Sequence, residues 1–256
     1  MIPPVSHSRI QLTLAFDGSA YQGWQSQRSG RGVQDVVQAA LGKLWAVPVL
    51  IVGSSRTDAG VHARALVAHV EMDGEPTSIP LRHLPLSINA LLPDDIRVMA
   101  AIRKPASFHA RFDASGKQYR YRVWNHPSMN PLLRSLAWHV PRALDLEAMR
   151  EAAAVLVGRH DFRAFTSNRG DLLEDGVRTL SRCEIRRRGH EITFIIEGSG
   201  FLYKMCRCLA GTLIQTGEGR FTPADVARML DGKDRKKAGM NAPAHGLVLW
   251  RVYYKK

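Results

Sequence analysis

The sequence has few cysteines, no long apolar run and a deficit of acidic residues relative to basic ones. Three cysteines are too few, and odd in number, for a disulfide framework, and Cys206-Arg207-Cys208 lacks the spacing and second pair of a zinc site. We expect these thiols, with Cys183, to be buried in a reducing cytosol. No stretch approaches the roughly 18 to 20 apolar residues that span a bilayer, and the first ten residues lack a signal peptide's apolar core. The sequence therefore predicts a cytoplasmic protein without membrane association.

Composition and charge narrow the class of partner. The chain has 256 residues, 45% of them hydrophobic, which is typical of a globular protein with one large or two modest domains. The formal charge is +13, and such an excess favours a polyanion, most often nucleic acid. One basic run is usually solvated surface, but three runs favour phosphate binding. The runs are Arg97, Arg103, Lys104, Arg111, Lys117, Arg120 and Arg122; Arg178, Arg182, Arg186, Arg187 and Arg188; and Arg235, Lys236 and Lys237.

Hydrophobic periodicity predicts the same order of elements in both halves of the chain. In the first half we expect strands near 10–16, 49–53, 65–72 and 95–103, with helices near 33–45 and 81–91. In the second half we expect strands near 117–125, 178–187, 191–197 and 247–254, with helices near 145–156, 202–215 and from 222. Both halves match the split βαβ order of a ferredoxin-like domain, βαββαβ. We therefore expect an α+β protein with an N-terminal domain over 1–104, a connection over 105–116 and a C-terminal domain over 117–256.

The segment from residue 53 to 63 is the most informative part of the chain. It reads Gly-Ser-Ser-Arg-Thr-Asp-Ala-Gly-Val-His-Ala and places one acid, Asp58, in a short turn between apolar runs. If the chain is still extended there, alternation points Arg56 and Asp58 to one face, where the cation keeps the carboxylate ionised. A lone carboxylate, with no second acid, cysteine nucleophile or metal-ligand cluster nearby, indicates covalent catalysis at carbon. The alternative is a polar hairpin in which Asp-Ala-Gly only makes the turn.

This segment resembles the active-site signature of the tRNA pseudouridine synthase A (TruA) family, Gly-Arg-Thr-Asp-Ala-Gly-Val-His-Ala. Other pieces resemble that family in the same order, from about residue 10 to about residue 254. They are residues 16–18, 21–25, 33–34, 89, 92–96, 108–112, 119–121, 158, 161–162, 165, 200–207, 242–243 and 246–247. Each piece is weak alone, but the ordered set is highly specific. The resemblance implies two ferredoxin-like domains whose antiparallel sheets join, with a basic cleft between them.

The resemblance also implies roles for particular side chains. Asp58 corresponds to the family's nucleophile, and Arg56 and Arg207 are cations that can pair with it. Tyr119 corresponds to the active-site tyrosine, which stacks on a base and can take part in proton transfer. Substrate contacts are implied for Tyr119, Phe108, Arg111 and Leu202. For Tyr119 and Phe108 the alternative is a ring in the core, and for Arg111 it is a solvated surface position.

Two histidines and the cofactor requirement complete the expectations for the site. No role follows from the spacing of His62 or His109, and we expect both to be hydrogen-bonded structural residues. Pseudouridine formation breaks the bond from ribose C1′ to uracil N1 and joins C1′ to C5. Because this change is redox-neutral and needs no external energy, we expect no cofactor and no metal.

The resemblance implies an isomerase that makes pseudouridine in the anticodon stem-loop of tRNA, at positions 38 to 40, and that works as a homodimer. A synthase with a different RNA target and a double ferredoxin-like RNA chaperone without chemistry are the alternatives. The Arg-Thr-Asp segment separates enzyme from chaperone, because a chaperone needs no fixed acid in a positive cleft.

Overall fold

The computed structural model describes residues 8–71, 79–167 and 175–255 and has a mixed α+β architecture with mostly antiparallel strand pairs. The predicted α+β class is confirmed. The chain divides into two compact units, Met1–Ser115 with Leu249–Lys256, and Gly116–Val248. The predicted limits assigned the whole C-terminal strand to the second half, whereas the residues from Leu249 onward group with the first unit. None of the helices within the described ranges has the length and apolar content needed to cross a bilayer.

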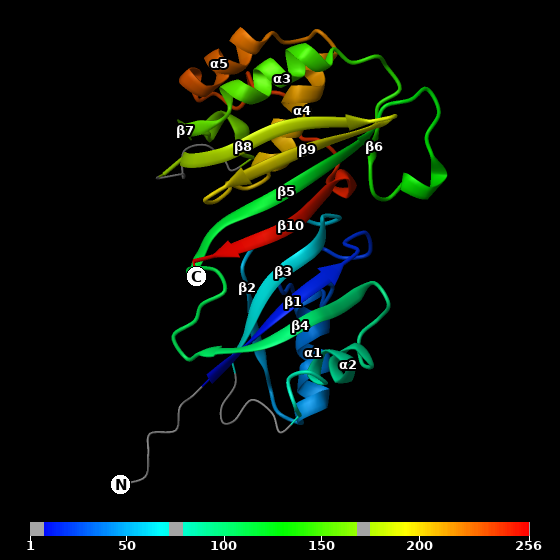
Figure 1. Ribbon diagram of the computed structural model, residues 1–256, viewed down its shortest axis with the longest axis vertical. Coiled ribbons are helices and arrows are strands. Elements are labelled where there is room, and N and C mark those ends of the chain that lie inside the picture. Colours follow the sequence, from blue (N-terminus) through cyan, green and yellow to red (C-terminus); the bar gives the residue numbers. More distant parts are fainter. Residues whose placement is uncertain (1–7, 72–78, 168–174, 256) are drawn as a thin grey trace. The chain divides into compact units, whose positions relative to one another are not determined.

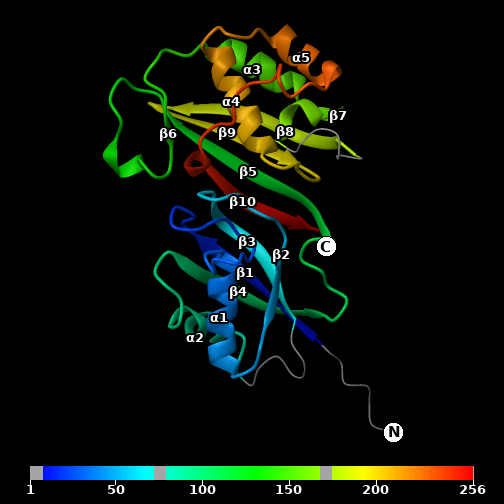
Figure 2. The same ribbon diagram turned by 180° about the vertical axis from the view of Figure 1, so that it is seen from behind.

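The first unit has the predicted order of elements (Figure 1). These are β1 (Ser8–Phe16), α1 (Val33–Trp45), β2 (Leu50–Gly53), β3 (His62–Glu71), α2 (Leu84–Asn89) and β4 (Ile96–Pro105). The strands lie in the order β4-β1-β3-β2 with every neighbouring pair antiparallel. The C-terminal strand β10 (Leu247–Tyr254) also neighbours β3. Both helices lie on one face of these strands, as the reverse view shows (Figure 2).

The core of the first unit follows from the two periodicities read in the sequence. Leu12 and Leu14 on β1 are fully buried and pair with Ala68 and Leu66 on β3. The buried face of α1 repeats at helical spacing. It consists of Val33, Gln34, Val37, Ala40 and Leu41. The helix ends at Ala46, whose left-handed φ of 56° breaks the helical path two residues before a proline.

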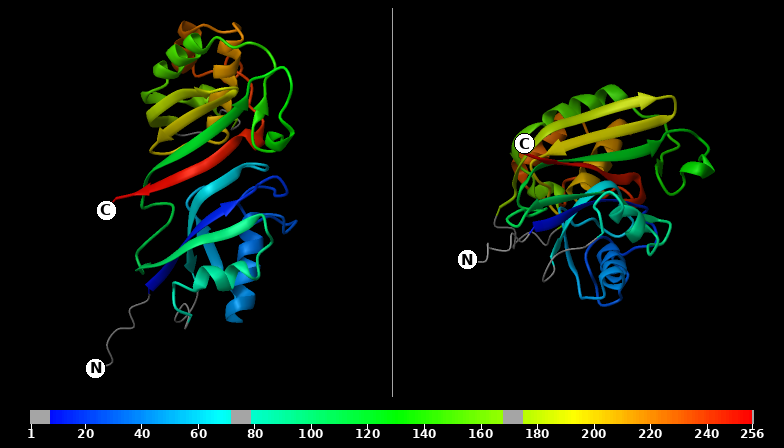
Figure 3. Two further views of the ribbon diagram at one scale, coloured as in Figure 1. Left: turned by 45° about the vertical axis from the view of Figure 1, so that its right-hand side comes forward. Right: turned by 60° about the horizontal axis from the view of Figure 1, so that its bottom comes forward.

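The second unit repeats the order with additions. It contains β5 (Ala114–Trp124), β6 (Trp138–His139), α3 (Leu146–Val155), β7 (Gly158–Asp161), β8 (Val177–Arg188), β9 (Glu191–Gly198), α4 (Met205–Gly217) and α5 (Pro223–Gly232). Among the described residues, 3₁₀ turns at Pro131–Leu133, Arg163–Phe165 and Ala244–Gly246 lie in the connections. The strands lie in the order β5-β9-β8-β7 in antiparallel pairs, and β6 pairs with β5 in parallel. Helices α3, α4 and α5 gather on one face of this sheet (Figure 3).

Helix boundaries in the second unit follow local chemistry. As predicted, Asp145 caps α3, and its carboxylate accepts hydrogen bonds from the backbone N–H groups of Glu147 and Ala148. Helix α4 was expected from residue 202 but begins at Met205. The reason is Lys204, whose φ of 58° is left-handed and cannot lie inside a right-handed helix.

Other boundaries differ where tertiary contacts decide them. Strand β3 begins at His62 and not near residue 65, which shortens the turn that carries Asp58. Helix α2 is shorter than expected, because Pro85 occupies its first turn. The short strands β6 and β7 were not predicted, since two to four residues carry too little periodicity.

Candidate functional site

The turn between β2 and β3 carries the predicted nucleophile. Strand β2 ends at Gly53, so Arg56, Thr57 and Asp58 are not in a strand, but their exposure still alternates. Thr57 is buried, whereas Arg56 is exposed and Asp58 is partly exposed. The turn closes with a hydrogen bond of 3.1 Å from the Val61 N–H to the Asp58 carbonyl. Both charged side chains of the turn are therefore accessible.

The segment from residue 17 to 25 fixes the backbone of this turn. The Trp24 N–H donates to the Thr57 carbonyl at 3.1 Å, and the Gly60 N–H donates to the Tyr21 carbonyl at 3.3 Å. Gly23, with φ of 90°, lies directly against the turn, and a Cβ there would overlap the Thr57 carbonyl oxygen. Backbone hydrogen bonds before and after Asp58 thus hold the residue in place.

His62 extends this attachment at the start of β3. Its Nδ1 lies 3.0 Å from both the Gly18 N–H and a carboxylate oxygen of Asp17, and the ring is buried. The expectation of a structural, hydrogen-bonded histidine is confirmed. Partial burial alone would raise the pKa of Asp17, but the hydrogen bonds from the Ser19 side chain and backbone, with a smaller contribution from nearby His62, outweigh it and lower that pKa. Asp17 is therefore a stable anion in this attachment.

Tyr21 anchors the same segment to the loop before β4. Its hydroxyl donates to Asp95 at 2.6 Å, and the Asp17 N–H donates to the Asp95 carbonyl at 2.9 Å. Burial first, and then the hydrogen bond to Asp95, raise the pKa of Tyr21 above its usual range. The phenol therefore stays protonated and continues to donate.

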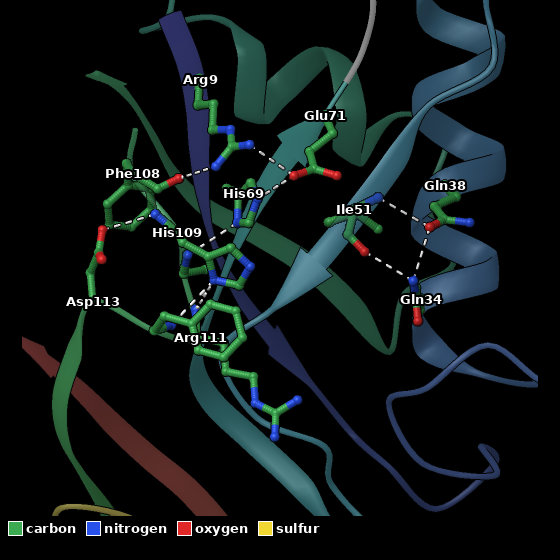
Figure 4. A network of polar contacts seen from close by, with 12 residues as sticks. Arg9, Gln34, Gln38, Ile51, His69, Glu71, Phe108, His109, Arg111 and Asp113 are labelled. Carbon is green, nitrogen blue, oxygen red and sulfur yellow. Dashed lines mark hydrogen bonds and ion pairs between the residues drawn. The ribbon is translucent and has the colours of Figure 1, made fainter. Parts of the chain in front are cut away.

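A chain of glutamine amides leads from the sheet to Arg56. The Arg56 Nε donates to Gln25 Oε1 at 3.0 Å, and Gln25 Nε2 donates to Gln34 Oε1 at 2.9 Å. Buried Gln34 in turn donates to the Ile51 carbonyl at 2.9 Å and to Gln38 at 3.1 Å (Figure 4). Gln38 Oε1 accepts from the Ile51 N–H at 3.1 Å. Because arginine can only donate hydrogen bonds, each glutamine amide in this hydrogen-bonded series has one orientation. Strand β2 and helix α1 therefore set the direction of the Arg56 guanidinium.

The second unit holds the other predicted residues. Tyr119 on β5 is 7% exposed, and its ring lies edge-on to Phe201 at 5.1 Å. Leu202 is buried in the loop before α4, and Arg207 is in the first turn of that helix. Arg207 Nε donates to the Ala242 carbonyl at 2.8 Å, and the Ala242 N–H donates to the Arg207 carbonyl at 3.0 Å. Residues 119, 201–207 and 242 thus meet although they are far apart in sequence.

Tyr121 shows what a core ring on the same strand is like. It is fully buried, its hydroxyl donates to the Pro243 carbonyl at 2.8 Å, and Gly246 lies against its ring. Burial raises its pKa above the usual range, although the charge of Arg207 acts in the opposite direction. Tyr121 therefore holds the 242–246 segment, which in turn holds Arg207.

Phe108 and Arg111 have different environments. Phe108 is buried, with its ring centroid 5.4 Å from that of Tyr254 and 6.2 Å from that of His69. Arg111 is exposed, and its guanidinium lies 5.8 Å from the centroid of Phe112. The substrate contacts expected of Phe108 and Arg111 stay predictions.

Comparison with known proteins places the chain in a family. The model of a family described as tRNA pseudouridine synthase matches residues 13–113 and 152–255. Three relatives named tRNA pseudouridine synthase A are 41%, 43% and 42% identical, those of Bacillus pumilus, Syntrophotalea carbinolica and Bacillus subtilis. The alignments cover 96% of this chain and 99%, 96% and 99% of those proteins.

The chain belongs to the tRNA pseudouridine synthase A family. The resemblance read from the sequence is confirmed, and the protein is an isomerase that acts on tRNA. A solved structure described as a Cbf5-Nop10-Gar1 complex matches 95% of this chain and 50% of that chain. Its TM-score of 0.36 and 12% identity are too low to support an argument.

The basic clusters of this tRNA pseudouridine synthase A family member are partly neutralised by acids, one within a run and one from another strand. Arg122 forms a 2.8 Å ion pair with Glu191, which comes from the neighbouring strand β9. Arg182 and Arg186 both pair with Glu184. The number of arginines in a run therefore overstates the charge that the run presents to RNA.

The described part of the same family member lacks a group of side chains that could hold a metal. Residues 8–71, 79–167 and 175–255 contain no group of three or more His, Cys, Asp or Glu side chains placed to hold a metal ion. Cys183 and Cys208 are buried free thiols, and burial raises their pKa to about 12 and about 11. These two cysteines are buried, as expected, and burial makes them poor ligands and nucleophiles.

Proposed function

We propose that this protein converts uridine to pseudouridine at positions 38 to 40 in the anticodon stem-loop of tRNA, with Asp58 as the nucleophile. The observation that carries the proposal is the partly exposed Asp58, on a turn whose backbone is held by residues 17–25. Membership of the tRNA pseudouridine synthase A family supports the reaction, and the net charge of +13 supports a polyanionic substrate.

In the proposed reaction, the Asp58 carboxylate attacks ribose C1′ and the bond from C1′ to uracil N1 breaks. The released uracil turns within the site, C5 attacks C1′, and the carboxylate leaves. A base then removes the proton from C5, while N1 gains a proton, so the product is an isomer of the substrate. An oriented carboxylate is needed for the first step, and the backbone hydrogen bonds on both sides of Asp58 support a fixed position for that residue.

We assign the second unit to base handling. Tyr119 stacks on the uracil and takes part in proton transfer, while Leu202 contacts the base and Arg207 pairs with the Asp58 carboxylate. The double attachment of Arg207 to Ala242 supports a fixed guanidinium. The proposal includes two ferredoxin-like domains with a basic cleft between them. The βαββαβ order of elements in the first unit supports the assignment of the domain type.

We also propose that two chains assemble into a homodimer and that one tRNA contacts both, with each active site built from one chain. A stem-loop is long relative to a chain of this size, and recognition of RNA shape requires contacts far from the target base. Light scattering at micromolar concentration measures the oligomer, and a fully active monomer would refute this part. The cytoplasmic location stays a prediction.

Replacing the nucleophile tests the chemical assignment. We expect Asp58→Asn to lower tritium release from tRNA labelled at uracil C5 by about four orders of magnitude or more, and to change tRNA affinity by less than about threefold. Asp231→Asn, an exposed aspartate on α5, is the matched control for the loss of one negative charge and should keep wild-type turnover. Full turnover by Asp58→Asn would sink the assignment.

A further inference from the structure

The loop between β4 and β5 has an unusual combination of a fixed backbone and an exposed aromatic tip. Its residues Phe108 to Asp113 lie outside any helix or strand. Nevertheless each of the six backbone N–H groups donates a hydrogen bond within the protein. At the tip, Phe112 is 75% exposed and Arg111 is exposed.

The half-buried ion pair of Arg9 with Glu71 and the buried His69 hold this loop from the sheet side (Figure 4). Arg9 on β1 donates to the Phe108 carbonyl at 2.6 Å and forms a 2.9 Å ion pair with Glu71. The Glu71 carboxylate also lies 3.1 Å from Nε2 of His69, which is 0% exposed. The Nδ1 of His69 accepts from the Ala110 N–H at 3.1 Å. An acceptor at Nδ1 requires the neutral ring with its proton on Nε2, which then donates to Glu71.

Further contacts complete the attachment. The Tyr254 hydroxyl donates to the Ala110 carbonyl at 2.7 Å, so both backbone groups of Ala110 are bound. Burial, with the nearby charge of Arg9, lowers the pKa of His69 against the effect of Glu71 and favours the neutral ring. The neutral ring keeps Nδ1 available to accept from the Ala110 N–H.

His109 organises the tip itself. Its N–H donates to the Asp113 carboxylate at 2.9 Å, and its carbonyl accepts from the Asp113 N–H at 3.0 Å. Its Nδ1 accepts from the N–H groups of Arg111 and Phe112 at 3.1 and 3.2 Å. The His109 ring lies 4.2 Å from the Phe112 ring at 31°. The expectation of a structural, hydrogen-bonded His109 is confirmed, and its ring supports Phe112 from one side.

The stability of the fold does not explain why a large aromatic ring is exposed on a backbone held by so many hydrogen bonds. Leaving Phe112 in water forgoes the free energy that its burial would provide, and a loop that only connects two strands does not need this many anchors. A rigid aromatic ring beside a guanidinium is, however, well suited to RNA, because every base has a face to stack and every nucleotide has a phosphate. The loop is ordered before binding, so little entropy is lost when RNA binds.

We propose that residues 108–113 form an RNA-binding platform in which Phe112 stacks on an unpaired nucleobase of tRNA and Arg111 contacts an adjacent phosphate. The proposal rests on tRNA being the substrate and adds a contact that the chemistry at Asp58 does not require. Within this segment the exposed ring is Phe112, whereas Phe108 is buried against Tyr254 and His69.

Salt titration separates the two contacts. Dissociation constants for a tRNA transcript are measured by filter binding at several KCl concentrations. We expect Phe112→Ala to raise the Kd at least about fivefold at every concentration, since stacking involves no counterion release. Arg111→Gln should instead flatten the slope of log affinity against log salt by about 0.7 to 0.9, the value for one phosphate contact.

Two further variants control for size and exposure. Phe112→Trp keeps a stacking ring, so its Kd should stay within about twofold of wild type and tRNA should quench its fluorescence more than that of wild type. Leu86→Ala removes a 70% exposed side chain from α2 in the same unit and should bind like wild type.

Several results would overturn the platform. A Kd for Phe112→Ala within about twofold of wild type would do so, and so would an equal loss in Leu86→Ala. A change of oligomeric state with unchanged tRNA affinity would assign Phe112 to a protein contact instead. The proposed function is tested separately, by comparing tritium release from wild type with that from Asp58→Asn. That comparison does not depend on whether the Phe112 and Arg111 variants bind tRNA normally.

Discussion

Gly23→Ala tests whether the backbone of the Asp58 turn must be held in one position. Gly23 has φ of 90°, a region that costs an L-residue about 1 to 2 kcal/mol. An added Cβ would also overlap the Thr57 carbonyl oxygen and lie 3.0 Å from the Asp58 carbonyl carbon. Neither neighbour is a flexible side chain, so the turn has to move by about 1 Å to restore ordinary contact.

Gly30→Ala, in the loop that follows this segment, is the matched control. Its φ of 67° carries a similar backbone cost, but no atom lies within 4 Å of an added Cβ. The difference between the two variants therefore isolates the displacement of the turn. A displacement of about 1 Å at a reacting group lowers the rate about 100-fold, and we expect that loss in Gly23→Ala only.

The assay is single-turnover tritium release with saturating enzyme, together with urea unfolding of both variants. We expect Gly30→Ala to lose about 1 kcal/mol of stability and keep its rate, and Gly23→Ala to lose more stability as well as the rate. Equal rates in two folded variants would refute the argument that contacts from Gly23 position Asp58.

Two other predictions concern buried groups. Gln34→Leu removes four hydrogen bonds, including those to Gln25 and Ile51. We expect the free energy of unfolding, measured in urea, to fall by about 2 to 4 kcal/mol and turnover to decrease. A loss of stability below about 1 kcal/mol would contradict the structural role of the glutamine chain. Burial raises the pKa of Cys183 from 9.0 to about 12. We therefore expect the thiol of the native protein to resist an aromatic disulfide reagent at about pH 8, whereas the same reagent should label the protein unfolded in urea. Rapid labelling of the native protein would contradict the burial of Cys183. Because the folded pKa is the higher one, this group's contribution to stability is complete below pH 9 and declines as the pH rises towards 12.

Strand and helix patterns could be read from the sequence because local periodicity determines them. Leu12 and Leu14 alternate along β1, and the buried face of α1 repeats at helical spacing. Asp145 marked the start of α3 because its side chain caps the backbone N–H groups of Glu147 and Ala148. The start of α4 was missed because nothing in the sequence marks Lys204 as left-handed.

The electrostatics of the basic runs could not be read in the same way. Arg122 is close to no acid in the sequence, but antiparallel pairing of β5 with β9 brings Glu191 to its side. A count of charges along the chain treats both residues as solvated. Only the register of the two strands shows that they neutralise one another.

The sequence by itself determined the family, the candidate nucleophile and the order of elements in the first unit. Its motif around Asp58 and the spacing of its apolar residues are both local properties of the chain. Only the tertiary structure decided which groups hold the site. The contacts of Gly23 with Thr57, and of His69 with Ala110, join residues that are 34 and 41 positions apart. Contacts of that kind depend on strand register and backbone direction, which sequence periodicity does not contain.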